Sequence, residues 1–254
     1  TPNFKFIGVT EEASLKLSGS SSEVVVKVVS PEILHKTELG GVVFCNNNEA
    51  DISTEIQDIK KRTAKYDVRG FLVVEKVKYR SSFGRELICS VRNSKDFGTI
   101  VGFGVGGIDT EFFGKRMDRA FNVICADNKD LLTDTLKKSS AYYKLAGLDR
   151  QKKKLLDDDK LRTLLNGLKK LGTAFSYENE DNSSNILITE CEINPAVITD
   201  DGELVAIDGL MKIDVRQTLS PRRPAEKLDK LFHPKSIAVI GVSDKTMNMG
   251  RIIL

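Results

Sequence analysis

The chain has 254 residues, enough for one large domain or two smaller ones. Its hydrophobic content of 40% and charged content of 30% are ordinary for a globular protein, and its net charge is only +3. No apolar run approaches the roughly 18 residues of a membrane-spanning helix, and no signal peptide opens the chain. We therefore expect a cytoplasmic protein that binds neither nucleic acid nor a membrane.

The four cysteines lie far apart and form no C-x-x-C pair. This spacing predicts reduced, mostly buried thiols rather than disulfides or zinc ligands. The residues concerned are Cys45, Cys89, Cys125 and Cys191.

Helical and strand periods alternate along the first half of the chain, which predicts an α/β or α+β class. Isoleucines 52, 56 and 59 recur at helical spacing, and the residues from 30 to 41 form a loop with Pro31 and a glycine pair. The predicted strands cover residues 24–29, 70–77, 85–91 and 99–103.

The second half predicts one amphipathic helix and one hairpin. Leucines 161, 164, 165, 168 and 171 mark the helix, and three aspartates at 157–159 stand at its start, where the helix dipole favours negative charge. Residues 186–208 predict a β-hairpin with Asp201-Gly202 as its turn.

The C-terminal part predicts a linker followed by a second small unit. Pro221, Arg222, Arg223 and Pro224 indicate the linker, and Ser236–Gly241 predicts a buried strand ending in glycine, like the opening of a Rossmann unit. Only about one strand and one turn of such a unit are present. Because the chain begins with Thr1 and ends in an apolar stretch, we expect it to be a fragment of a longer one.

Lys27 stands inside the apolar strand at 24–29. A lysine there is costly unless its ammonium has a partner, and a phosphate group is one such partner. The alternative is a lysine whose stem lies along the strand while its ammonium reaches water.

His35 is one of two histidines, the other being His233. It lies in the loop that ends at Gly40-Gly41, where exposed backbone N–H groups can cradle an anion. The alternative is a structural or merely exposed histidine.

The predicted hairpin carries oxygen ligands on one face. Glu190, Glu192 and Asn194 alternate along a strand, and the predicted turn places Asn194 opposite Gly209, beside Asp208. Mg²⁺ takes one or two protein oxygens and leaves room for phosphate, so Asn194 and Asp208 are candidate metal ligands. The alternative is a solvent-facing acidic stripe. A proline directly after Asn194 and the apolar setting of Asp208 favour the metal.

Gly102-Phe-Gly104-Val-Gly106-Gly107 satisfies the dinucleotide pattern G-x-G-x-x-G. No Rossmann-type helix is predicted after it, and no acid ends a second strand at the required distance. A glycine-rich loop against bound phosphates is therefore the preferred interpretation, and a plain tight turn is the alternative.

Taken together, these motifs resemble the ATP-grasp subunit of ADP-forming acyl-CoA synthetases, which is related to succinyl-CoA synthetase β subunits. The segment from Lys27 to Val42 resembles that family's Lys-x-x-Ser-Pro-x-x-x-His-Lys-Ser-Asp-x-Gly-Gly-Val. Further matching segments are Val73-Val74-Glu75, Gly84-Arg85-Glu86, Phe97-Gly98, Gly102–Ile108, Glu111 with Arg119, Glu192-Ile-Asn-Pro and Asp208-Gly209. Phe232 to Leu254 resembles the start of the CoA-binding domain of the same enzymes.

The resemblance implies an ATP-grasp fold in which two subdomains sandwich the nucleotide, with ATP or ADP and Mg²⁺ as ligands. It implies an ATP-grasp domain at residues 1–218, a linker at 219–231 and a truncated CoA-binding domain at 232–254. The implied residues are His35, Lys27 and Arg119 as catalytic groups; Lys27, Glu75, Glu86, Gly40, Gly41, Gly106 and Gly107 at the nucleotide; and Asn194 and Asp208 at the metal.

The implied reaction is acyl-CoA + ADP + phosphate ⇌ acid + CoA + ATP through a phosphohistidine, with His35 as a second relay histidine. The implied partners are nucleotide, phosphate, and CoA-binding and ligase domains in the same longer chain or in a partner subunit; a homo-oligomer is compatible with this. One alternative is a non-catalytic module that binds ATP or acyl-CoA as a regulatory ligand, which the intact lysine, histidine, asparagine and aspartate set disfavours. Another is an ATP-grasp carboxylate–amine ligase, which the CoA-domain-like C-terminus disfavours.

Overall fold

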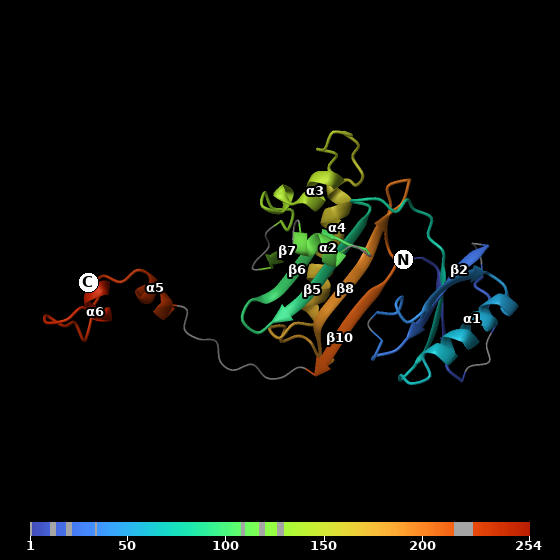
Figure 1. Cartoon of the computed structure of the whole chain (residues 1–254), viewed down its shortest axis with the longest axis horizontal. Coiled ribbons are helices and arrows are strands. Elements are labelled where there is room, and N and C mark those ends of the chain that lie inside the picture. The colour runs from blue at the N-terminus through green and yellow to red at the C-terminus, as the bar shows by residue number, and fades with distance from the viewer. Residues whose placement is uncertain are drawn as a thin grey trace. The chain divides into compact units, whose positions relative to one another are not determined.

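The computed structural model describes residues 2–10, 14–18, 22–33, 35–107, 110–116, 120–125, 130–215 and 226–254. The chain divides into two compact units, Thr1–Arg216 and Gln217–Leu254 (Figure 1). In the described ranges no helix is long and apolar enough to cross a membrane. Helices and antiparallel sheets together make the chain mixed α+β, which confirms the predicted class.

The first sheet has the strand order β1-β4-β2-β3, and all neighbours are antiparallel. Alternate valines of β2 face helix α1, whose isoleucines at 52, 56 and 59 are buried as predicted. The Asn48 side chain caps α1 by accepting the Asp51 N–H. The elements are β1 (Phe4–Gly8), β2 (Glu23–Val29), β3 (Val42–Asn46), α1 (Glu49–Arg62) and β4 (Gly70–Glu75).

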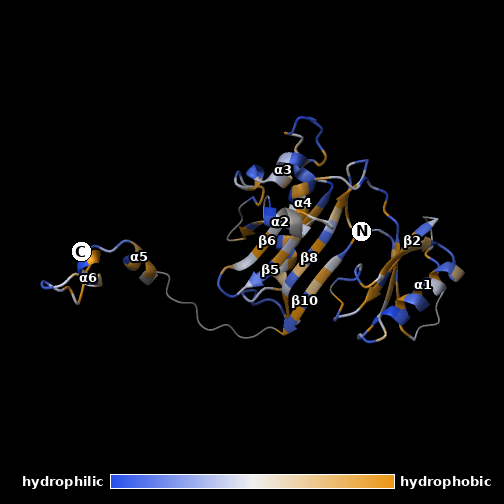
Figure 2. Cartoon of the chain, viewed as in Figure 1, coloured by the Kyte–Doolittle hydropathy of each residue, from blue (hydrophilic) through white to orange (hydrophobic). Residues whose placement is uncertain are grey.

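The second sheet has the order β10-β8-β5-β6-β7, with β9 paired to the far end of β8. One face of this sheet packs against α4, and Figure 2 shows hydrophobic colour along its central strands. The strands are β5 (Glu86–Ser94), β6 (Gly98–Val105), β7 (Phe121–Ile124), β8 (Ile186–Ile198), β9 (Leu204–Ala206) and β10 (Gly209–Val215). The helices of this part are α2 (Thr110–Arg116), the 3-10 turn η1 (Leu136–Lys138), α3 (Ser140–Leu145) and α4 (Asp158–Ala174).

Helix α4 is the predicted amphipathic helix. Leu161, Leu165 and Leu168 are buried against the sheet, which confirms the periodicity. Gly172 lets the helix approach closely, because a Cβ there would overlap the Val91 side chain on β5.

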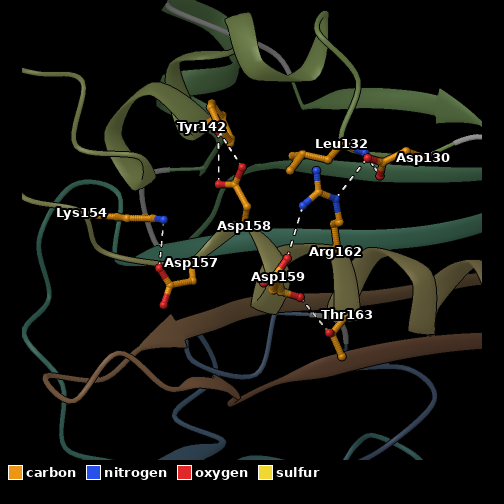
Figure 3. Close-up of polar contacts among 9 residues, drawn as sticks. All are labelled: Asp130, Leu132, Tyr142, Lys154, Asp157, Asp158, Asp159, Arg162 and Thr163. Carbon is orange, nitrogen blue, oxygen red and sulfur yellow. Dashed lines mark hydrogen bonds and ion pairs between the residues drawn. The ribbon is translucent and has the colours of Figure 1, made fainter.

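The aspartates at the start of α4 are held by a network of polar contacts (Figure 3). Lys154 pairs with Asp157 at 2.9 Å, and the Tyr142 hydroxyl donates to Asp158 at 3.2 Å. Arg162 bridges Asp159 and Asp130. Basic side chains therefore balance the charges of Asp157 and Asp159, and the acidic run stands at the helix end where the dipole favours negative charge.

All four cysteines are free thiols, as predicted. Cys89 and Cys191 are buried, while Cys45 and Cys125 are half-buried. Burial raises the pKa of all four thiols, to about 11 for Cys45 and to about 12 for Cys89.

The C-terminal unit differs from its prediction. Ser236–Gly241 contains no strand and is largely exposed, with Ile240 93% exposed. A strand needs a hydrogen-bonded neighbour, and the described part of this unit, residues 226–254, contains none. The unit instead has two short helices, α5 (Glu226–Phe232), which begins inside the predicted linker, and α6 (Met249–Ile253). The linker residues 221–224 lie outside the described ranges, and the domain boundaries stay predictions.

A buried asparagine ties α4 to the second sheet. The Asn93 amide on β5 donates to the carbonyl oxygens of Gly172 at 3.0 Å, Phe175 at 3.2 Å and Ile188 at 2.8 Å. Its Oδ1 accepts the Thr99 hydroxyl at 2.7 Å. One side chain therefore provides hydrogen-bond partners for polar groups at the C-terminal end of α4, on β6 and on β8.

We predict that Asn93→Ala lowers the free energy of unfolding by about 2–4 kcal/mol, because it leaves several buried polar groups unpaired. Urea unfolding followed by circular dichroism measures this. The control is Asn122→Ala, which changes an exposed asparagine on β7 of the same sheet and should stay within about 0.5 kcal/mol. Equal stability of the two variants would contradict the role of Asn93.

Candidate functional site

Lys27 connects the first sheet to the corner that precedes β10. Its side chain is 5% exposed, and its Nζ donates to the carbonyl oxygen of Ile207 at 2.7 Å. Burial lowers the pKa of the Lys27 ammonium, while the nearby Asp208 carboxylate opposes that shift. The Lys27 ammonium therefore has a partner within the chain, a backbone carbonyl oxygen, and a nearby carboxylate stabilises its charge.

Lys36 adds a second cation to the same corner. Its Nζ lies 3.0 Å from Asp208 Oδ1 and 3.4 Å from Oδ2. The Gly209 N–H also donates to Asp208 Oδ1, at 2.9 Å. Because Lys36 directly follows His35, the sequence predicts that its ammonium can offset phosphate charge.

Asn194 and Asp208 are brought together, as predicted. The Asn194 N–H donates to the Asp208 carbonyl at 3.0 Å. The Asn194 side-chain Oδ1 accepts the Gly107 N–H at 3.0 Å, and its amide lies 3.4 Å from a Glu192 carboxylate oxygen. Asn194 thus joins the hairpin to the glycine-rich segment after β6.

The predicted register of the hairpin was wrong by one residue. Gly209 pairs with Ile193 rather than with Asn194. The Thr199 N–H donates to the Glu203 carbonyl, so the turn contains three residues instead of two. Gly202 adopts φ 78° within it, as the third position of such a turn requires.

Glu86 meets the glycine-rich segment from β5. Its carbonyl accepts the Gly106 N–H at 2.8 Å, and its carboxylate accepts the hydroxyls of Tyr79 at 3.0 Å and Ser81 at 2.8 Å. Burial, with the Glu86 charge second, raises the pKa of Tyr79 to about 12. Gly107 has φ 87°, and a Cβ there would overlap the Glu86 carboxylate, so this position needs glycine.

The glycine-rich segment is shorter than the predicted loop. Gly102 and Gly104 lie within β6, and of the four glycines only Gly106 and Gly107 follow the strand. The helix that follows, α2, has seven residues. A Rossmann fingerprint is thus excluded, in agreement with the sequence analysis.

The loop that carries His35 is folded on itself. His35 is largely exposed, and its Nδ1 lies 4.0 Å from Glu38. The N–H groups of Gly40 and Gly41 donate to the carbonyls of Thr37 and Lys36, at 3.0 and 2.7 Å. These hydrogen bonds contradict the expectation of exposed N–H donors at the glycine pair, because both groups close the turn.

Another predicted residue, Glu75, is not brought to the residues around Asp208. Glu75 ends β4, where its carboxylate lies 3.4 Å from the Asn3 backbone N. By strand alternation it shares the α1 face of the sheet with Val73, opposite to Lys27. Arg119 lies outside the described residues.

The cluster formed by Lys27, Lys36, Gly107, Asn194 and Asp208 is here called the lysine–aspartate corner. It combines two ammonium groups with one carboxylate and one amide oxygen. Over the described ranges no three His, Cys, Asp or Glu side chains group as metal ligands. A cavity of about 440 Å³ between α4 and β9 is lined by none of the predicted site residues.

This donor set fits Mg²⁺ rather than a transition metal. Its oxygens are hard ligands, and they are few, so phosphate oxygens and water would complete the coordination. The two ammonium groups suit the negative charge of the same phosphates.

Comparison with known proteins agrees with the resemblance. The family model of the ATP-grasp domain matches residues 1–213. The chain is 27% identical over 235 residues to the ADP-forming acetate–CoA ligase II of Archaeoglobus fulgidus, covering 92% of this chain and 31% of that protein. It is 31% identical over 156 residues to the beta subunit of ADP-forming acetate–CoA ligase I of Pyrococcus furiosus, covering 59% and 63%. The chain therefore spans less than two thirds of the length of these relatives.

Solved structures show the same fold. A Pyrococcus horikoshii Ot3 protein matches with a TM-score of 0.56 and 26% identity, covering 78% of this chain and 76% of that one. The acetyl-coenzyme A synthetase 1 of Ca. Korarchaeum cryptofilum, in complex with coenzyme A and Ca-AMPCP, matches with a TM-score of 0.60 and 22% identity, covering 84% and 86%. With the family model spanning most of its length, the chain belongs to the ATP-grasp domain family.

Proposed function

We propose that this chain is the nucleotide-binding part of an ADP-forming acid–CoA ligase and that the lysine–aspartate corner holds the phosphates of ATP or ADP together with Mg²⁺. The observation that carries the proposal is the convergence of Lys27 and Lys36 on the segment 207–208. Two ammonium groups share one carboxylate, Asp208, which offsets only part of their charge, so the pair suits a bound anion. The relatives named above, which are ADP-forming ligases, support the same reaction class.

The two lysines would act as point charges on the phosphates. Lys27 is held in place by the Ile207 carbonyl, and Lys36 by Asp208. Phosphate oxygens would take over part of these contacts and offset the charge of the transferred group.

Asp208 and Asn194 would hold Mg²⁺ through a carboxylate and an amide oxygen. When bound, the ion would neutralise charge on the phosphoryl group and orient it. Because Lys36 already neutralises Asp208, the metal and the lysine would compete for one carboxylate, and phosphate would give Lys36 a new partner.

The remaining residues have proposed roles at the edges of the site. Glu86 would accept hydroxyl groups of the ribose or the amine of the base, as it now accepts Tyr79 and Ser81. His35, next to Lys36, would receive the phosphoryl group and pass it to a histidine of a ligase domain. Arg119 keeps the role that the family implies, whereas Glu75, on the face of the first sheet opposite to Lys27, is not assigned to the nucleotide. CoA-binding and ligase domains would be supplied by a longer chain or a partner subunit, and the protein would act in the cytoplasm.

One solved relative supports the nucleotide and relay parts of this proposal. A Ca. Korarchaeum cryptofilum structure is described as containing Mg-AMPPCP, with a phosphohistidine segment pointing towards the nucleotide-binding site. That protein shares the fold of this chain at a TM-score of 0.51.

We predict that Asp208→Asn weakens Mg-ADP binding by about one to two decades, because one charged contact contributes roughly 1.5–3 kcal/mol. Isothermal titration calorimetry at fixed free Mg²⁺ measures this, and a parallel titration with EDTA should show a smaller difference between the two proteins. Asp181→Asn, in an exposed turn, is the matched control. Equal affinity of Asp208→Asn and wild type at matched Mg²⁺ would remove the metal assignment.

We predict that Lys27→Met, which keeps most of the length of the buried side chain but removes its charge, also lowers ADP affinity by about one to two decades. The loss should persist in EDTA, since Lys27 would contact phosphate directly. Lys95→Met on the β5–β6 turn serves as the control. Native circular dichroism with unchanged nucleotide affinity would end the phosphate role of Lys27.

We predict that His35→Ala, in the whole enzyme that contains this domain, lowers acyl-CoA-dependent ATP formation by several decades while ADP affinity is retained. Retained affinity separates a relay from a binding role. A fall of less than about threefold, well under 1.4 kcal/mol in barrier, would make His35 structural. Absence of the overall reaction in the wild-type enzyme would instead favour the regulatory-module alternative.

A further inference from the structure

Strand β10 is an edge of the second sheet. It pairs with β8 from Gly209 to Val215, and within the described ranges no other strand pairs with it. All seven of its residues are exposed. An edge strand presents unpaired backbone N–H and C=O groups, so proteins commonly block such strands with proline, bulges or unbalanced charge. β10 contains no proline, and its two charges, Lys212 and Asp214, are of opposite sign.

One face of β10 is apolar. Met211, Ile213 and Val215 alternate along the strand and are 46%, 61% and 63% exposed. Their partners on β8 include Cys191 and Ile188, which belong to the core under α4. Figure 2 shows hydrophobic and hydrophilic colours alternating along this strand. The core thus continues to the sheet edge without being covered there.

The other face of β10 carries the charges. Lys212 pairs with Glu190 of β8 at 2.6 Å, and Asp214 accepts the Val215 N–H. The bulge in this pairing lies on the β8 side, because Lys212 and Ile213 pair with Glu190 and Ile188. β10 itself therefore contributes no extra residue to this pairing.

The sequence of β10 is self-complementary in one antiparallel register. If two copies meet about a two-fold axis at Ile213, each Lys212 lies opposite the other copy's Asp214, and each Met211 lies opposite the other copy's Val215. Residues opposite each other in an antiparallel pair point to the same side, so apolar residues meet apolar ones and opposite charges meet. A shift by two residues places Lys212 opposite Lys212, or Asp214 opposite Asp214.

We propose that two copies of this chain associate through β10 in the register centred on Ile213, so that the second sheet continues across both. In the dimer, the faces of the second sheet that pack against α4 in each copy become continuous. The exposed apolar residues at the edge of each face, which include Ile186 of β8, then meet across the two-fold axis. The interface is isologous, as a two-fold axis requires. The inference is independent of nucleotide binding.

The test uses two opposite charge reversals and their mixture. Lys212→Glu and Asp214→Lys each place like charges opposite each other in a homodimer. In a mixed dimer of the two variants, however, each glutamate or aspartate again faces a lysine. Light scattering coupled to size exclusion distinguishes the monomer of 28.2 kDa from a dimer over a series of protein concentrations.

We expect wild type to be dimeric, each single variant to dissociate about tenfold or more readily, and the equimolar mixture to recover the dimer. Asp96→Lys, an exposed reversal on the β5–β6 turn, is the matched control and should behave as wild type. A wild type that stays monomeric at the highest soluble concentration overturns the proposal. A dimer that neither variant weakens, or variants that the mixture does not rescue, overturns it equally.

Discussion

The structure depends on the burial of one ammonium group. Lys27 lies in the middle of an apolar strand and is only 5% exposed. A charge in that position requires a hydrogen-bond acceptor, which the Ile207 carbonyl provides from the connection between β9 and β10. That single requirement fixes the corner before β10 against β2, and Lys36, Asp208 and Asn194 are held around it.

The corner combines residues that are far apart in the chain. Lys27 and Ile207 are separated by 180 residues. Lys27 offers a flexible point charge from β2, and Asn194 and Asp208 offer oxygen ligands from the hairpin. Such a set suits a polyphosphate, because its large negative charge attracts the lysine and its oxygens can also coordinate a metal ion. Lys27 comes from an inner strand of the first sheet, whereas Asp208 comes from the short connection between β9 and β10.

Sequence reasoning predicted the elements better than their contacts. Helices α1 and α4 and most strands were evident from periodicity, because burial of one face imposes it. The hairpin was also predicted, but its turn contains one residue more than expected. The extra residue shifts the pairing partner of Gly209 from Asn194 to Ile193, and no hydrophobic pattern encodes such a shift. The partner of Lys27 could not be predicted because it is a backbone carbonyl, which every residue carries. The glycines at 40 and 41 were assigned to anion binding, although the same residues also suit the turn that they form.

The cysteines carry a consequence for the chemistry of the whole chain. A thiol reacts with oxidants and alkylating reagents as its thiolate, and burial disfavours that form at all four positions. Burial raises the pKa of Cys45 to about 11, so this thiol stays protonated at neutral pH. The chain should therefore tolerate air and peroxide without forming mixed disulfides, and a cysteine introduced on its surface would be modified selectively by thiol-reactive dyes.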